Sequence, residues 1–177
     1  MTEDSKGLQD CTRTDTIQWA SSWPELADED ERHFLFGYLE ERFGIPRKIF
    51  KDYLLFRRKK SWQLMKKADH SREASTLKVA KIGLRAFQRV GAFVKPTTRM
   101  IQIFGHRATK AVVEVDEEQL AGLLSGKRLS VELPADKGYV ILKLKNDRIV
   151  GLGFFINGEV ASQISSKELR KEMLVSL

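Results

Sequence analysis

The chain has 177 residues, of which 42% are hydrophobic and 31% are charged, and its formal net charge at pH 7 is +7. This length accommodates one domain or two small ones, and the apolar content argues against a wholly disordered chain. No run approaches the roughly 18 apolar residues that a membrane-spanning helix requires. The polar, acidic first residues do not match a signal peptide. The single cysteine, Cys11, cannot form an internal disulfide and favours a reducing, cytoplasmic setting.

The charges are distributed unevenly along the chain. Residues 1–45 carry 4 Lys/Arg and 11 Asp/Glu, whereas residues 46–110 carry 18 Lys/Arg and only 3 Asp/Glu. Residues 111–177 are nearly neutral, with 9 basic and 10 acidic side chains. A basic block of this size predicts a surface that meets a polyanion, with nucleic acid as the first candidate. A basic surface that serves solubility or binds an acidic protein is the alternative interpretation.

The first elements are predicted from capping signals. Residues 1–27 are expected to form a flexible tail, with Trp19 and Trp23 as anchors onto the core. A helix is predicted from Asp28 as N-cap to Gly44 as C-terminal stop. Its expected apolar face consists of Phe34, Leu35, Tyr38, Leu39 and Phe43. A second, short helix is expected from Pro46 through Phe50.

An antiparallel sheet is predicted to follow, which gives a basic α+β domain over residues 28–104. Its expected strands are 53–57, 62–65, 77–89 with a break near Gly83, and 99–104. Residues 58–61 are expected to connect the first two strands as a hairpin, residues 68–75 to form a loop, and residues 96–98 to turn the chain.

A second domain is predicted over residues 111–177, after a linker at 105–110. Strand 111–115 precedes a helix that is capped at Asp116 and ends at Leu124, with Gly126 as its stop. The strands expected next are 128–133, 138–145, 148–155 and 159–162, with tight turns at Asn146-Asp147 and Asn157-Gly158. Ser165 and Glu168 predict the cap of a last helix. Short strands with tight turns favour a small, partly closed, mainly antiparallel barrel.

The sequence offers no recognisable catalytic motif, and we expect a protein that is not an enzyme and has no cofactor. The GLG at 151–153 lacks the third glycine of a dinucleotide fingerprint and is not followed by a helix. Glycines inside a strand are better explained by a bend or a close backbone approach. The SGKRLS at 125–130 lacks the Ser or Thr that follows Lys in a phosphate loop. The three histidines share no metal-ligand spacing, so no metal site is expected.

The second half also resembles a known RNA-binding module. The runs VVEVD at 112–116, LSGK at 124–127, GYVIL at 138–142 and VGLG at 150–153 resemble the PUA domain. The segment GLGFFINGEVASQISSKELR is similar to the C-terminal PUA-like appendage of the Sun-family RNA cytosine-C5 methyltransferases. The whole chain resembles the Nip-type ribosome-biogenesis factors, which join a small N-terminal α/β (pre-PUA-like) domain to a C-terminal PUA domain. The resemblance implies a PUA-like pseudo-barrel and a non-catalytic function in ribosome biogenesis, rRNA processing or tRNA modification.

The expected partner is structured RNA, either an rRNA precursor or a tRNA, bound across the first domain and the domain junction. Lys and Arg would contact phosphates, and an aromatic side chain could stack on an unpaired base. The candidate residues of the basic block are Arg57, Arg58, Lys59, Lys60, Trp62, Lys66, Lys67, Arg85, Arg89, Lys95, Arg99, Arg107 and Lys110. The resemblance to the PUA domain adds Lys127, Arg128, Lys167 and Arg170.

Two of these assignments have competing interpretations. Trp62 is also typical of a core aromatic at strand spacing, and this interpretation is slightly preferred. Lys59 and Lys60 are also typical of a solvated turn. As a function from another class, the chain could be an adaptor whose acidic first helix and tail bind a basic partner such as a ribosomal protein or an RNA methyltransferase.

Overall fold

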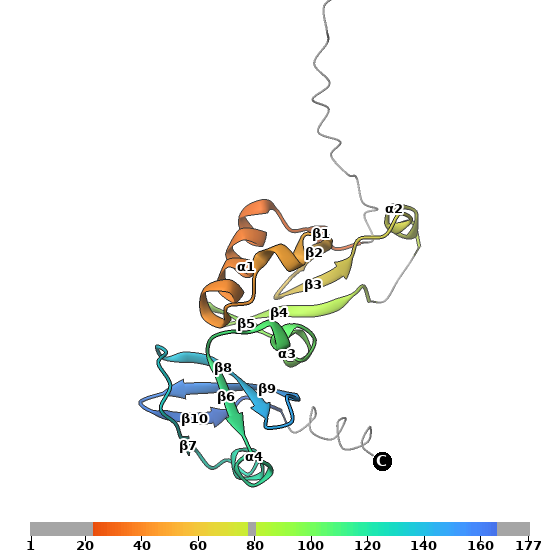
Figure 1. Ribbon diagram of the computed structural model, residues 1–177. Coiled ribbons are helices and arrows are strands. Elements are labelled where there is room, and N and C mark those ends of the chain that lie inside the picture. The colour runs from red at the N-terminus through yellow and green to blue at the C-terminus, as the bar shows by residue number, and fades with distance from the viewer. Residues whose placement is uncertain (1–22, 78–80, 166–177) are drawn as a thin grey trace, which may run out of the picture.

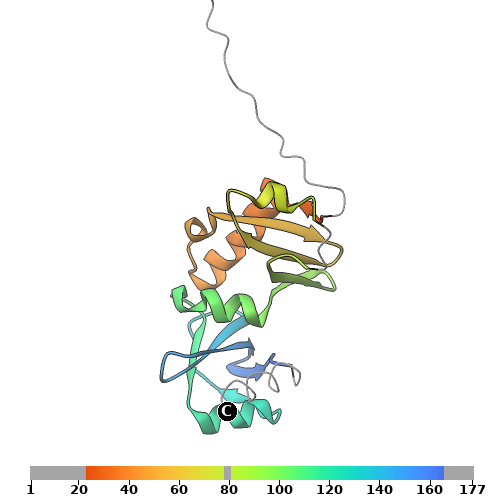
Figure 2. The ribbon, with the colours of Figure 1, turned by 90° about the vertical axis from the view of Figure 1, so that its right-hand side faces the viewer.

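The structure is a computed structural model and describes residues 23–77 and 81–165. It is a mixed α+β fold with two five-stranded, mostly antiparallel sheets (Figure 1). The first sheet has the strand order β1-β2-β3-β4-β5, and the second has the order β6-β8-β9-β10-β7. Helix α3 lies between the two sheets in both views (Figures 1 and 2). The predicted fold class, α+β and mainly antiparallel, is confirmed at this level.

Helix α1 (Glu29–Phe43) begins and ends where its capping residues predict. The Asp28 carboxylate accepts a hydrogen bond from the Glu31 N–H at 2.7 Å, and Gly44 ends the helix in the left-handed conformation with φ +67°. The buried face differs from the predicted one at one aromatic residue. Phe34 is 64% exposed, whereas Phe36 is buried and stacks on Phe50 with the ring centroids 4.4 Å apart. Residues two apart on a helix point to nearly opposite sides, so only one of these rings can face the core.

The first sheet begins earlier in the chain than predicted. Strand β1 (Glu25–Leu26) pairs with β2 (Tyr53–Arg58), and Trp23 packs edge-on against Phe56 with the ring centroids 5.8 Å apart. Residues 23–27 therefore belong to the folded unit and not to a tail. Residues 1–22, with Trp19, lie outside the described residues.

The predicted hairpin is present: β2 and β3 (Ser61–Lys66) are joined by the two-residue turn Lys59-Lys60. The short helix η1 (Arg47–Phe50) follows Pro46 as expected. The stretch predicted as a loop contains one helical turn, α2 (Ser71–Ala74). Strand β4 (Leu84–Val90) starts after Gly83, at the predicted break, and pairs with β5 (Phe93–Pro96), which the sequence did not predict.

The prediction of a strand over 99–104 is wrong, because this segment forms helix α3 (Thr98–Phe104). Thr97 caps it by accepting a hydrogen bond from the Met100 N–H at 3.2 Å. The apolar run fits either structure when read alone. In the fold Met100, Ile101 and Phe104 are buried while Ile103 is 48% exposed, which is the burial pattern of a helix.

The second sheet follows the predicted order. Strand β6 (Val112–Val115) is parallel to β8 (Gly138–Leu144), and α4 (Glu117–Leu124) connects them with a capping box between Asp116 and Gln119. Strands β9 (Ile149–Ile156) and β10 (Glu159–Ser162) form a hairpin through Asn157-Gly158, and both turn residues have positive φ. The strand expected over 128–133 is limited to β7 (Leu129–Ser130). The expected helix after Ser165 lies outside the described residues.

One hydrophobic core connects the two sheets. A single cluster of buried side chains extends from Leu35 in α1 through Met100 in α3 to Val160 in β10. Between α3 and β6 the chain forms the short helix η2 (Gly105–Arg107), and both Thr109 and Lys110 then donate backbone hydrogen bonds to the Phe43 carbonyl. Residues 105–110, predicted as a linker, are thus fixed to the end of α1. None of the described helices is long and apolar enough to span a membrane.

Candidate functional site

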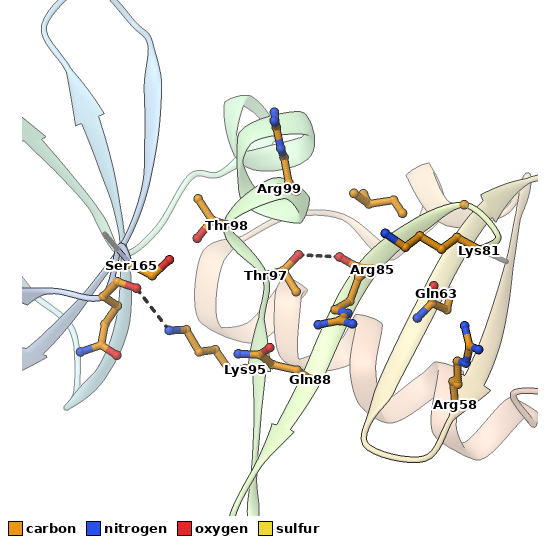
Figure 3. Close-up of a pocket in the computed structure, with 13 residues that line it drawn as sticks. Arg58, Gln63, Lys81, Arg85, Gln88, Lys95, Thr97, Thr98, Arg99 and Ser165 are labelled. Atoms are coloured by element: carbon orange, nitrogen blue, oxygen red, sulfur yellow. Dashed lines mark hydrogen bonds between the residues drawn. The ribbon is translucent and has the colours of Figure 1, made fainter. Parts of the chain in front are cut away.

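A groove of about 820 Å³ opens where the first sheet, α3 and the chain after β10 meet (Figure 3). Among the described residues that line it there are five basic side chains and no acidic one. Figure 3 shows Arg85, Gln88 and Lys95 in the middle of the groove, with Arg58 and Lys81 toward one side and Ser165 on the other. The residues that line it are Arg58, Gln63, Lys81, Gly83, Leu84, Arg85, Gln88, Lys95, Thr97, Thr98, Arg99, Gln163 and Ser165.

A β-bulge in β4 decides which of its side chains face the groove. Trp62 of β3 pairs with Phe87 and the next residue, Gln63, pairs with Arg85, so Ala86 is an extra residue in the ladder. Side chains alternate along a regular strand, and Arg85 and Gln88, three residues apart, would then point to opposite faces. The bulge brings both to the groove face, and it is the kind of irregularity that re-aims side chains near functional sites.

Thr97 ties the bulged strand to α3. Its backbone N–H donates to the Ala86 carbonyl at 2.9 Å, and its hydroxyl donates to the Arg85 carbonyl at 2.5 Å. The same hydroxyl oxygen caps α3 by accepting from the Met100 N–H. These three hydrogen bonds connect the backbone of β4 at Arg85 and Ala86 to the backbone of α3 at Met100. The backbone positions of Arg85 and Arg99 are therefore fixed relative to each other.

The far wall of the groove comes from the second sheet. The Lys95 ammonium donates to the Gln163 carbonyl at 3.4 Å and lies 5.6 Å from the ring centroid of Tyr139. Gly151 allows this wall to approach α3, because a Cβ added there would lie 2.9 Å from Ile164 Cγ1 and 3.1 Å from Thr98 Cγ2. The GLG stretch therefore provides a close approach between elements, which is one of the two explanations expected from the sequence.

Four of the five cations of the groove have no acidic partner within the described residues. The ion pairs among the described residues lie outside the groove and involve other basic residues, among them Arg32, Arg47, Arg57, Arg128 and Lys143. The fifth cation, Lys95, is held by the contacts just described. Arg58, Lys81, Arg85 and Arg99 thus leave a positive charge uncompensated on one concave face. An anion entering the groove would meet charge-assisted donors without first displacing a protein carboxylate.

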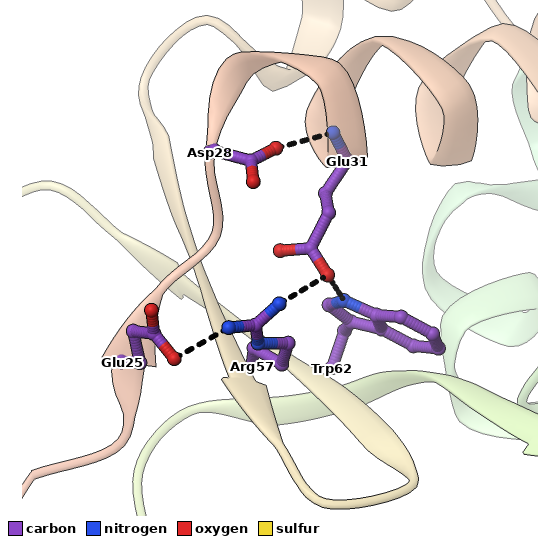
Figure 4. Close-up of polar contacts among 5 residues, drawn as sticks. All are labelled: Glu25, Asp28, Glu31, Arg57 and Trp62. Atoms are coloured by element: carbon purple, nitrogen blue, oxygen red, sulfur yellow. Dashed lines mark hydrogen bonds and ion pairs between the residues drawn. The ribbon is translucent and has the colours of Figure 1, made fainter.

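Arg57 and Trp62, both predicted to bind RNA, have structural roles instead (Figure 4). The Arg57 guanidinium donates to Glu25 at 2.6 Å and to Glu31 at 3.3 Å. The hydrogen bond that Arg57 donates to Glu25, together with the nearby Glu31 carboxylate, raises the pKa of Arg57 above its ordinary value. Trp62 is only 5% exposed, and its indole N–H donates to Glu31 at 3.4 Å. The prediction that Trp62 stacks on a base is therefore wrong, since its side chain is almost completely buried within the protein.

The other predicted residues of the first domain lie outside the groove. Lys59, Lys60, Lys66 and Lys67 are exposed at the two ends of the β2–β3 hairpin. The Arg89 guanidinium lies 5.7 Å from the centroid of the Trp62 ring, on the sheet face that carries α1. Of the predicted residues that the structure describes, it thus brings together only Arg58, Arg85, Lys95 and Arg99.

The predicted residues beyond the first domain are dispersed. Arg107 donates to His106 at 3.1 Å, and Lys110 lines a separate cavity near α1. Lys127 is exposed after α4, and Arg128 pairs with Glu159 at 3.1 Å. Lys167 and Arg170 lie outside the described residues.

Sequence reasoning missed Lys81, Gln63 and Gln88 as groove residues. Lys81 lies inside the stretch that was predicted as one long strand, so its position could not be deduced. Gln63 is 6% exposed and lines the groove as one of the few buried polar side chains. Its place beside Arg85 depends on the bulge, for which the sequence gives no signal.

The described residues contain no group of three or more His, Cys, Asp or Glu side chains that could hold a metal ion. Neither the comparison with protein-family models nor the search of curated proteins found a match for this chain.

Proposed function

We propose that this protein binds RNA and that the groove between the first sheet and α3 holds the phosphate backbone. The observation that carries the proposal is the groove lining, whose described residues include five Lys or Arg side chains and no Asp or Glu. Phosphate contacts supply most of the affinity of nucleic-acid binders, and Lys and Arg are the usual donors. The polar Gln and Thr side chains between the cations add donors for phosphate or sugar oxygens.

A long polyanion fits this site better than a small anionic metabolite. Small-molecule pockets are mostly apolar and enclose their ligand, whereas this groove is open and lined mainly by polar side chains. Its cations come from β2, β4, β5, α3 and the segment before β4, so the positive charge is spread along the groove and not focused on one point. A chain of phosphates can contact such a series in succession.

The finer assignments rest on the sequence resemblance. We propose that the second sheet with α4 is a PUA-like pseudo-barrel and that the first sheet with α1 is a pre-PUA-like domain. On this basis the protein acts without catalysis in ribosome biogenesis or in rRNA or tRNA modification, in the cytoplasm. The parallel pairing of β6 with β8 around a capped helix and the glycine-bearing β9 support the comparison.

The proposal is tested by neutralising groove cations and measuring how affinity depends on salt. The groove variant combines Arg58→Gln, Arg85→Gln and Arg99→Gln, and the control variant combines Lys59→Gln, Lys60→Gln and Lys66→Gln. Both lose three positive charges, so only the location of the charge differs. If three phosphate contacts disappear, the slope of log K against log salt becomes flatter by about 2 in the groove variant. Equal slopes for the two variants would refute the proposed site.

An adaptor function is the second candidate, and one observation favours it. The first turn of α1 exposes Glu29 and Asp30, whose carboxylates are not needed for the N-cap that Asp28 provides. This acidic end could bind a basic segment of a ribosomal protein or an RNA methyltransferase. Glu29→Gln with Asp30→Asn would then abolish capture of such a partner and leave RNA affinity intact.

A further inference from the structure

The β4–β5 hairpin ends in two exposed apolar side chains. Phe93 is 75% exposed and Val90 is 48% exposed, and the two residues pair directly across the hairpin. They flank a two-residue turn in which Gly91 has φ +60°, as expected for the first turn position of a tight hairpin. Single exposed apolar side chains are common on protein surfaces, so the significance of Phe93 depends on its position relative to the groove.

Strand alternation places Phe93 on the same sheet face as the groove. Lys95, two residues along β5, lines the groove, whereas Val94 between them packs against the core. The partner strand shows the same alternation, since Gln88 lines the groove and pairs with Lys95. The Cα atoms of Phe93 and Lys95 are therefore roughly 7 Å apart along the strand. Phe93 thus lies on the groove face of the sheet, two residues along β5 from Lys95.

We propose that Phe93 is a stacking platform for an unpaired base of the RNA whose phosphates lie in the groove. This inference rests on the proposed function and narrows its substrate to single-stranded RNA, such as a loop, bulge or end. An aromatic ring can stack only on a base whose face is free, and bases inside a duplex are covered by their neighbours. Stacking needs no particular base, so the cations and Phe93 together bind single strands with little sequence preference.

Phe93 is the aromatic residue that meets both requirements for this role among the described residues. Trp62, the aromatic first predicted to stack, is buried under α1. Phe34 is 64% exposed, but it projects from α1, on the opposite side of the first sheet. Tyr139 is half-buried beneath the Lys95 ammonium. Among the aromatic residues that the structure describes, only Phe93 is both exposed and on the groove face.

The experiment compares Phe93→Ala with Phe93→Trp and with Phe34→Ala as the matched control. The probe is a fluorescently labelled uridine oligonucleotide of about 12 nucleotides, within the site sizes seen for single-strand binders. Loss of one stacked base weakens binding about 5- to 150-fold in Phe93→Ala, whereas Phe93→Trp binds at least as tightly as the wild type. Phe34→Ala leaves the affinity unchanged. The salt slope of Phe93→Ala matches that of the wild type, because no phosphate contact is removed.

A perfectly paired RNA hairpin with a short, stable loop serves as the second probe. We expect it to bind more weakly than the oligonucleotide and to be insensitive to Phe93→Ala. The inference is overturned if Phe93→Ala binds the oligonucleotide as tightly as the wild type, or if it weakens both probes equally. If in that case the groove variant still flattens the salt slope, the groove remains the RNA site and only the stacking role of Phe93 fails. If neither variant affects binding, the proposed function fails as well.

Discussion

Gly153 allows a sharp test of how the GLG stretch works. A Cβ added at this glycine would lie 2.7 Å from Val160 Cγ1 and 3.2 Å from both Leu142 Cδ2 and Val140 Cγ2. All three of these neighbours are fully buried, so none can swing out to solvent. The backbone at Gly153 does not adopt a left-handed conformation, and any penalty of Gly153→Ala is therefore steric.

The expected cost follows from overpacking a closed core. Forcing an extra methyl group into such a site destabilises a protein by about 1–3 kcal/mol. Val160→Ala alone removes two buried methyl groups and costs about 2 kcal/mol. The double variant Gly153→Ala/Val160→Ala relieves the shortest contact, and its cost falls below the sum of the single costs by about 1 kcal/mol or more.

Urea unfolding of the four proteins measures these differences, provided the slope of the free energy against urea stays constant. RNA affinity is measured in parallel and remains that of the wild type, because Gly153 lies inside the second sheet. A loss of RNA affinity without a loss of stability would mean that Gly153 contributes to binding and not to packing. Additive costs in the double variant, or a cost of Gly153→Ala below about 0.5 kcal/mol, would refute the steric reasoning.

Two further predictions concern the polar groups around α1. Arg57→Gln breaks the ion pairs with Glu25 and Glu31, so it lowers the urea midpoint and leaves RNA affinity unchanged. Arg58→Gln weakens RNA binding and leaves the urea midpoint unchanged, because Arg58 lines the groove. Identical effects of the two substitutions would contradict the assigned roles. Burial raises the pKa of Tyr38 to about 12 from 10.0, so the phenol is favoured neutral in the folded state. The stabilisation that the neutral phenol gives is complete below pH 10 and declines as the pH rises to 12, by at most about 3 kcal/mol. The Tyr38→Phe variant lacks this decline in the free energy of unfolding. Equal pH dependence of unfolding in the variant and the wild type would contradict the raised pKa of Tyr38.

The elements that the sequence predicted well are those with local signals. Asp28 and Gly44 bound α1, Asp116 with Gln119 caps α4, and Asn157-Gly158 turns β9 into β10. Each signal depends on hydrogen bonds or φ preferences within a few residues, so no knowledge of the tertiary fold is needed.

The predictions that proved wrong concern segments whose structure depends on contacts between residues far apart in the sequence. The run from Met100 to Phe104 suits a strand or a helix, and packing between the two sheets selects the helix. Phe34 and Phe36 are equally apolar, and only the position of Phe50 decides which of them is buried.

The site was predictable as a region but not as a set of residues. The excess of cations in residues 46–110 points to the first sheet, and four of the five groove cations were among the candidates. Counting charges does not reveal that Arg57 is neutralised by Glu25 and Glu31, which lie 32 and 26 residues away. Nor does it reveal the bulge at Ala86, which turns Arg85 toward the groove.

The central claim is that RNA binds in the groove, and the most direct test is to map the contact surface by amide NMR during a titration. Adding the uridine oligonucleotide to the ¹⁵N-labelled protein is predicted to shift the amide signals of Arg58, Arg85, Gln88 and Arg99, and to leave those of α4 and β7 in place. Shifts confined to α4, β7 or the solvent face of α1 would contradict the account.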